Sequence, residues 1–213
     1  MPSESAADQA SVLLIGLSSH YQRTHDKALE IPMRQLADGI LKMQIHKGEL
    51  KGMFLSWENL WHAYGNTQSY ALLLAGKTLG EPKYINASLE EINHFYSYLY
   101  GIEFLEFMNV EFKNQKTNIL TKRQFPQIAY GIRPIVFAST EAYRQTGEEK
   151  YKSIAKQWLG WFSGDNTASK VMYHSETGRC YDGIRSKEDI NKNSGAESTI
   201  EALLSIQAFQ NIN

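Results

Sequence analysis

Two carboxylates near the end of the sequence have the type and spacing that acid–base chemistry needs. They are Asp182 and Glu197, in the segment GRCYDGIRSKEDINKNSGAEST, residues 178–199. Glu197 falls in the first turn of a predicted helix, where the helix dipole favours the ionised form of a carboxylate. An ionised carboxylate suits a general base or an acceptor for hydroxyl groups, which leaves Asp182 as an acid or a positioning group. These two residues are the predicted catalytic pair.

Both carboxylates also have a purely structural interpretation. Ser194 and Glu197 have the S-x-x-E spacing of a capping box, in which each side chain bonds the backbone amide of the other residue. Asp182 precedes Gly183, and a turn aspartate in such a position bonds its own backbone. The sequence leaves the structural and the chemical interpretation of each residue open.

Aromatic and polar residues near predicted helix starts and loops are candidates for binding a ligand. Aromatic rings provide flat apolar faces, while arginine and asparagine side chains bond carboxylates or hydroxyl groups. Trp57, Trp61 and Tyr64 also have the spacing of an ordinary buried helix face. Tyr64 and Tyr130 occupy equivalent positions in two repeats of the sequence, so they could equally have a purely structural role around the helical array. The predicted binding residues are Trp57, Trp61, Tyr64, Tyr130, Arg133, Tyr181 and Asn193.

Composition excludes several functional classes. The net charge of −1 argues against a nucleic-acid partner, which requires a basic face. Cys180 is the single cysteine, so the 213-residue chain has no internal disulfide and no site with several thiolates. The six histidines have no zinc-site spacing, and no phosphate-binding glycine loop or Gly-x-Ser-x-Gly motif is present. We therefore expect no metal and no cofactor.

The chain also shows no sign of membrane insertion or export. The first residues, MPSESAADQ, lack the basic and apolar regions of a signal peptide. The longest apolar run, VLLIGL at 12–17, is too short to span a bilayer. The single cysteine agrees with a reducing compartment, so we expect a cytoplasmic protein.

An internal repeat organises the sequence. Residues 63–84 and 129–151 both begin with Ala-Tyr-Gly, continue as an apolar-rich helix, break at glycine and resume at a Lys-Tyr pair. A weaker copy covers 10–29, and half a copy covers 195–209. Each full copy predicts a helix, a turn and a second helix, with Gly147 ending one helix and Pro82 in the first turn of another. The expected fold is all-α, with about three and a half helical hairpins.

Three longer connections separate the hairpins: residues 45–55, 102–125 and 164–193. Within the last, VMYHSETGRCYDGI alternates around a glycine turn and predicts a small β-hairpin. Because every long connection joins one helical hairpin to the next, we expect all three at one end of the helical array. Connections on a rigid scaffold commonly carry function, so that end is the predicted site.

The C-terminal motifs resemble a known family. WFSGDNTASKVMYHSETGRCYDGI, followed by NKNSGAESTIEALL, is similar to the end of the toroid domain attached to bacterial and archaeal glycosyltransferases. That domain belongs to the six-hairpin (α/α) toroids of carbohydrate-active enzymes. The resemblance implies an oligosaccharide ligand and a glycosidase-like site at Asp182 and Glu197, since glycoside hydrolysis commonly uses two carboxyl groups. A lanthionine-cyclase-like zinc toroid is excluded because its thiol and imidazole ligands are absent.

A closed toroid of this family needs six hairpins, and the sequence predicts three and a half. We therefore expect residues 1–213 to form a single, partial toroid: either the chain is a fragment or a split subunit, or a partner chain or a second copy completes the ring. Two functions follow as hypotheses. One is a glycosidase-like enzyme that acts on oligosaccharides. The other is a non-catalytic module that binds a glycan or supports a glycosyltransferase.

Overall fold

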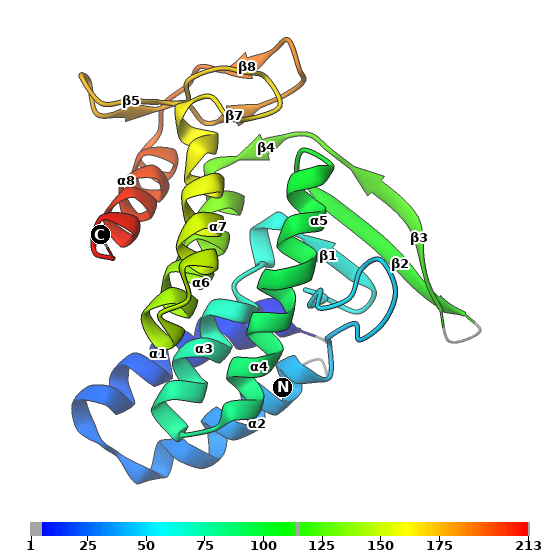
Figure 1. Ribbon diagram of the computed structural model, residues 1–213, viewed down its shortest axis with the longest axis vertical. Coiled ribbons are helices and arrows are strands. Elements are labelled where there is room, and N and C mark those ends of the chain that lie inside the picture. Colours follow the sequence, from blue (N-terminus) through cyan, green and yellow to red (C-terminus); the bar gives the residue numbers. More distant parts are fainter. Residues whose placement is uncertain (1–5, 114–115, 213) are drawn as a thin grey trace.

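The computed structural model describes residues 6–113 and 116–212 and is predominantly helical (Figure 1). The helices that follow the repeat are paired as antiparallel hairpins, and each pair is joined by a short turn. Their bounds are α1 Ala7–Thr24, α2 Glu30–Leu41, α3 Gln68–Leu79, α4 Pro82–Glu90, α5 Tyr96–Gly101, α6 Ala129–Thr146, α7 Glu149–Leu159 and α8 Ala196–Gln210. A π-helical turn, Glu91–Phe95, joins α4 to α5.

The hairpin turns follow the local signals in the sequence. Gly80 ends α3 with φ +67°, and Gly147 ends α6 with φ +71°, a left-handed conformation that glycine adopts without steric cost. Pro82 occupies the first turn of α4, where its missing amide hydrogen is not needed. His25 takes the left-handed position after α1. The predicted helical hairpins are therefore confirmed.

The first helices of successive hairpins pack side by side and form an inner layer. Helix α1 packs on α3, α3 on α6, and α6 on α8, whereas α2, α4 and α7 pack outside them. The inner layer is thus an arc with α1 at one end and α8 at the other. Both ends carry exposed apolar side chains, among them Val12 and Leu13 on α1 and Ile200 and Leu203 on α8. This arrangement is a partial (α/α) toroid, as the sequence predicts.

Small sheets occupy the long connections, which gather along the upper and right-hand side of Figure 1, while the short turns point toward the lower left. The predicted hairpin in 171–184 is present as β5 Tyr173–His174 and β6 Arg179–Cys180. A second and longer antiparallel ribbon, which the sequence analysis does not predict, contains β2 Phe107–Lys113 and β3 Lys116–Arg123. It pairs through β2 with β1 Leu60–His62. A third sheet contains β4 Gln127–Ile128, β7 Gly183–Ile184 and β8 Ile190–Asn191.

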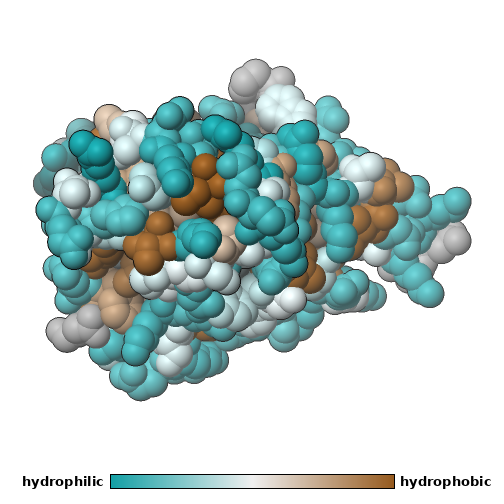
Figure 2. Space-filling view, turned by 90° about the horizontal axis from the view of Figure 1, so that it is seen from above, coloured by the Kyte–Doolittle hydropathy of each residue, from teal (hydrophilic) through white to brown (hydrophobic). Residues whose placement is uncertain are grey.

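Seen from above, the surface is mainly hydrophilic with separate apolar patches, and the β2–β3 ribbon projects from the body of the molecule (Figure 2). Phe112 and Leu120 on this ribbon are among the exposed apolar side chains. No helix among the described residues is long and apolar enough to cross a membrane.

Candidate functional site

The N-terminal ends of the inner helices bring polar and aromatic residues to the loop side of the arc. Asp8 lies in the first turn of α1, and Tyr64 lies in a 3-10 turn, Ala63–Gly65, shortly before α3. Tyr130 and Glu197 lie in the first turns of α6 and α8. The repeated Ala-Tyr-Gly motif therefore places its tyrosine at the same level of two neighbouring inner helices.

The two repeat tyrosines form a pair. The ring centroids of Tyr64 and Tyr130 are 6.1 Å apart with an angle of 31° between the planes. Tyr64 is 46% exposed, so its ring is available to a ligand. Partial burial, then the charges of Glu106 and Glu197, raise the pKa of Tyr64 and keep its phenol neutral. The pair thus presents an aromatic surface at the loop end.

Glu197 is exposed and lines a shallow depression together with Tyr130 and Asp182. Its carboxylate has no hydrogen bond or ion pair within the described residues. The predicted capping box is wrong: α8 begins at Ala196 with Gly195 as its N-cap, and no side chain of the cap residue bonds the helix. Glu197 is therefore free of the capping role and open to solvent.

Asp182, from a distant part of the chain, bonds two residues at the start of α8. Its Oδ1 accepts hydrogen bonds from the Gly195 amide, at 3.1 Å, and from the Ser198 hydroxyl, at 2.8 Å. The bonds tie the end of the β5–β6 ribbon to the start of α8, beside Glu197. Asp182 is accordingly a positioning group for the helix that carries Glu197, and it lines the same depression.

Arg133 pairs with a carboxylate that the sequence analysis did not single out. It forms an ion pair with Glu201, one turn after Glu197 on α8, and its guanidinium lies over the rings of Tyr130 and Phe137. Burial raises the pKa of Glu201, whereas Arg133 opposes that rise. Glu201 lies one helical turn after Glu197, so the sequence could have indicated that the two share a face of α8. The pairing of Glu201 with Arg133 depends on the packing of α6 on α8, which the sequence does not show.

The remaining predicted binding residues are dispersed. Trp61 is 1% exposed and packs edge-on against Phe95, so its proposed contact with a ligand is wrong. Trp57 is 40% exposed and lies in the connection before β1. Tyr181 packs edge-on against His174, with ring centroids 4.8 Å apart. Asn193 is exposed, and its backbone carbonyl accepts a hydrogen bond from the Asp182 amide at 2.9 Å.

Two further pairs of charged or titratable groups lie near Tyr64. His62 Nε2 is 3.4 Å from Asp8 Oδ2, and His62 is not among the site residues predicted from the sequence. Glu106 on the loop before β2 pairs with Arg123 at the end of β3. His62, Tyr64 and Glu106 line a second shallow hollow at the loop end. Sequence spacing could not reveal these pairs, because each joins segments that are far apart in the chain.

Metal-ligand side chains do not gather in the described part of the chain: residues 6–113 and 116–212 contain no group of three or more His, Cys, Asp or Glu that could hold an ion. Cys180 is buried, and burial followed by the nearby Asp182 charge raises the pKa of its thiol to about 12. A thiol in this state is a poor nucleophile. The chemistry available at the loop end is therefore that of carboxylates, tyrosines, His62 and the arginines.

No protein-family model and no curated protein sequence matches this chain. Solved structures do match. A sugar epimerase from a ruminal bacterium superposes with a TM-score of 0.71 at 14% identity, over 99% of this chain and 56% of that chain. A glycoside hydrolase family 76 mannosidase from Bacteroides thetaiotaomicron gives 0.70 at 12% identity, over 98% of this chain and 56% of that one.

An inactive variant of an α-1,6-mannanase of Salegentibacter, in complex with α-1,6-mannotriose, gives a TM-score of 0.65 at 15% identity. It covers 96% of this chain and 54% of that chain. This chain thus spans about half the length of these three solved chains. The likeness establishes the fold, and the resemblance to a glycosyltransferase-attached domain stays a prediction. The chain is a partial toroid of the six-hairpin type found in carbohydrate-active enzymes.

Proposed function

We propose that this chain binds an oligosaccharide at the loop end of the arc, in the depression lined by Tyr130, Asp182 and Glu197. Glu197 accepts hydrogen bonds from sugar hydroxyls, and the rings of Tyr64 and Tyr130 stack on the C–H faces of the sugar. The observation that carries the proposal is the position of Glu197. It is an exposed carboxylate without a hydrogen-bond or ion-pair partner among residues 6–113 and 116–212, beside two tyrosine rings, where the inner helices begin.

The state of the side chains supports this role. Because Glu197 is exposed, water solvates its charge when no ligand is bound. The same carboxylate can form charge-assisted hydrogen bonds with a ligand. The Arg133–Glu201 pair below it fixes α8 against α6. Structures of similar fold include one that holds α-1,6-mannotriose, which makes α-1,6-linked manno-oligosaccharides the first ligands to test.

Hydrolysis at the same depression is a second candidate function. It requires a second carboxyl group across the scissile bond, and Asp182 is the candidate within this depression. Because Asp182 Oδ1 already accepts two hydrogen bonds, a positioning role suits it better than that of a general acid. Binding is therefore the primary proposal, and Glu197 is the base or hydroxyl acceptor if turnover occurs.

The test is to incubate the purified chain with a panel of α- and β-linked oligosaccharides and to record both retained ligand and cleavage products by mass spectrometry. We expect one ligand class to be retained. Glu197→Gln should weaken its binding about tenfold, the effect of losing roughly 1.4 kcal/mol from a charged hydrogen bond. Glu176→Gln is the matched control, since Glu176 is exposed on the β5–β6 turn and lines neither loop-end hollow.

Each outcome of this experiment has one meaning. Products that disappear with Glu197→Gln assign a glycosidase, and retention without products assigns a binding module. If no saccharide is retained, or if Glu176→Gln weakens binding as much as Glu197→Gln, the proposal is wrong.

The open ends of the arc favour a scaffolding contribution as well. Val12 and Leu13 on α1, and Ile200 and Leu203 on α8, are apolar and exposed. Exposed apolar surface of this kind marks contact sites in soluble proteins. A partner chain that completes the ring, such as a glycosyltransferase-linked segment, or a second copy would cover them. Light scattering of the purified chain tests the second copy, because a single chain has a mass of 24.3 kDa.

A further inference from the structure

A separate concavity of about 220 Å³ lies between the C-terminal ends of α5 and α7 and the loop at 165–167. It is distinct from the depression around Glu197. Gln127 of β4 lines the concavity, whereas the next residue, Ile128, lines the depression. Since successive side chains of a strand point to opposite faces, β4 separates the two hollows. The motif WFSGDN, residues 161–166, borders the concavity and has no part in the loop-end site.

Four aromatic side chains lie around the base of this concavity: Tyr100 is partly exposed, whereas Phe104, Trp158 and Trp161 are buried. Trp158 meets Tyr100 and Phe104 edge-on, with ring centroids 5.7 and 5.5 Å away, and Trp161 lines the same concavity. The indole N–H of Trp161 donates to Gln127 Oε1 at 3.4 Å. The indole N–H of Trp158 is buried and has no hydrogen-bond partner in the described part of the chain. A buried donor without a partner is uncommon and calls for an explanation.

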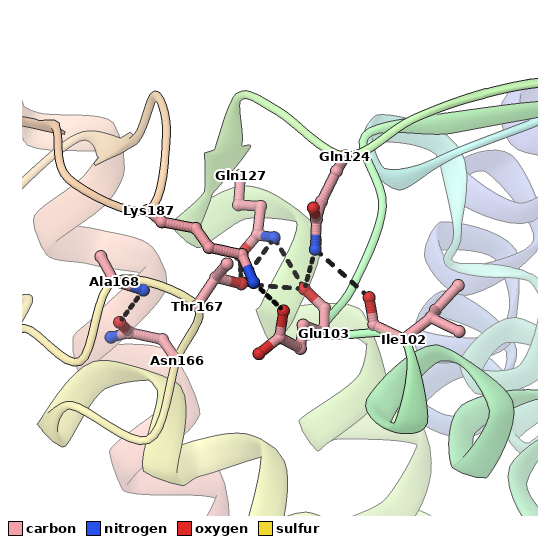
Figure 3. Close-up of polar contacts among 8 residues, drawn as sticks. All are labelled: Ile102, Glu103, Gln124, Gln127, Asn166, Thr167, Ala168 and Lys187. Atoms are coloured by element: carbon pink, nitrogen blue, oxygen red, sulfur yellow. Dashed lines mark hydrogen bonds and ion pairs between the residues drawn. The ribbon is translucent and has the colours of Figure 1, made fainter.

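The mouth of the concavity is polar and is built around Glu103 (Figure 3). The Glu103 carbonyl accepts hydrogen bonds from Gln127 Nε2, at 2.7 Å, and from Thr167 Oγ1, at 3.0 Å. Its carboxylate pairs with Lys187 Nζ at 3.1 Å. The segment that contains Glu103 is therefore bonded to three others, through Gln127, Thr167 and Lys187. These long-range contacts define the shape of the mouth.

The backbone at the mouth is strained. Glu103 and Phe104 both have left-handed φ values, +61° and +71°, which residues other than glycine rarely adopt. The hydrogen bonds to the Glu103 carbonyl hold this conformation. Such strain persists where the surroundings fix it, and it is concentrated at ligand sites.

We propose that this concavity binds a single neutral sugar residue, or a polyol of that size. The partly exposed ring of Tyr100 suits a C–H face, and the amides and hydroxyls at the mouth suit ligand hydroxyl groups. The volume is below the roughly 300 Å³ at which sites for larger ligands begin, so one ring fits and a chain does not. The two carboxylates at the concavity, Glu103 and Asp165, already have partners. Lys187 pairs with Glu103, and the Tyr100 hydroxyl donates a hydrogen bond to Asp165 at 3.0 Å. A cationic ligand is therefore not favoured.

Fluorine NMR of the chain labelled with 5-fluorotryptophan tests this site directly. The four tryptophans give separate signals, each assigned by one Trp→Phe variant. During titration with methyl glycosides of neutral hexoses, the Trp158 and Trp161 signals should shift and saturate in the millimolar range. The signal of Trp57, which does not line the concavity, should stay in place. Gln157→Ala and Asp165→Asn change exposed lining residues and should each weaken binding severalfold.

Three results would overturn the proposal. One is the absence of a saturating shift at Trp158 and Trp161 with every hexose glycoside. Another is a titration that neither Gln157→Ala nor Asp165→Asn affects while both variants remain folded. The third is saturation by small alkylammonium ions and not by sugars. Glu197→Gln should leave the titration unchanged, so failure at the loop-end depression is distinguished from failure here.

Discussion

Asp182 accepts a hydrogen bond of 2.8 Å from the hydroxyl of Ser198, a residue in the first turn of α8. The same oxygen accepts the Gly195 amide. Asp182, which lies between β6 and β7, thus anchors the start of α8 through the amide of the N-cap residue and a side-chain hydroxyl. The consequence is that the orientation of Glu197 depends on Asp182, although the two residues are in different elements.

The first prediction concerns this bond. Asp182→Ala should lower the free energy of unfolding by about 1–2 kcal/mol, because the Gly195 amide and the buried Ser198 hydroxyl lose their common acceptor. Asp182→Asn keeps an oxygen in place and should lose less than half as much. Urea denaturation measures both. Equal stability of Asp182→Ala and the wild type would show that the bond does not hold the helix start.

The contact between Asp182 and the start of α8 illustrates what the sequence could reveal and what it could not. The start of α8 was predicted to within a residue or two, because its apolar periodicity is local. The S-x-x-E spacing of Ser194 and Glu197 is typical of a capping box, yet the side chain that bonds the start of α8 is Asp182. Long-range contacts of this kind leave no periodic signal in a single sequence.

The second prediction concerns the ion pair between Arg133 and Glu201. Their side chains are only 19% and 8% exposed. Arg133→Ala should destabilise the fold by about 3 kcal/mol, since it leaves a buried carboxylate without a partner. Replacing both residues by methionine should recover most of that loss, as judged by chemical denaturation.

A solvent-exposed pair provides the control for this comparison. The side chains of Arg185 and Asp189 are both 57% exposed, at an N–O distance of 3.5 Å. Arg185→Ala should cost less than about 1 kcal/mol. A similar loss for Arg185→Ala and Arg133→Ala would contradict the importance of burial at the α6–α8 contact.

The third prediction compares two glycines with similar backbone and different surroundings. Gly48 has φ +81° with open space where a Cβ would lie, whereas Gly52 has φ +88° and a Cβ there would be 2.6 Å from the Glu90 carbonyl oxygen. Gly48→Ala should cost about 1–2 kcal/mol for the left-handed backbone alone. Gly52→Ala should cost clearly more, because the loop must also move away from the helix. Equal losses in urea denaturation would refute the close approach.

The acids near Gly52 show why part of the fold was not predicted. The connection at 45–55 is predicted only as a link between two helical hairpins, and its apolar side chains are buried. Nothing in the spacing of EEINHF, however, indicates which of Glu90 and Glu91 is buried. Glu91 is the buried one, and its hydrogen-bond donors, the Phe54 amide and the Ser69 hydroxyl, come from segments far from it in the chain.

The fourth prediction is a pH dependence of stability that originates at Glu91. This residue is 2% exposed and accepts hydrogen bonds from the Phe54 amide, at 2.9 Å, and the Ser69 hydroxyl, at 2.6 Å. Burial raises its pKa from 4.5 to about 7, and the two hydrogen bonds only partly oppose the rise. The folded protein therefore holds this proton more tightly than the unfolded chain does.

Because the pKa is higher in the folded state, the contribution of Glu91 is fully present below pH 4.5 and is lost as the pH rises through 7. The loss is on the order of 3 kcal/mol. Glu91→Gln should remove this slope and make the protein more stable than the wild type at pH 8. Glu90→Gln should keep the slope, since Glu90 is partly exposed and paired with Lys51 at 3.0 Å. Urea denaturation between pH 4.5 and 8 distinguishes them: an unchanged slope in Glu91→Gln would place the titrating group elsewhere.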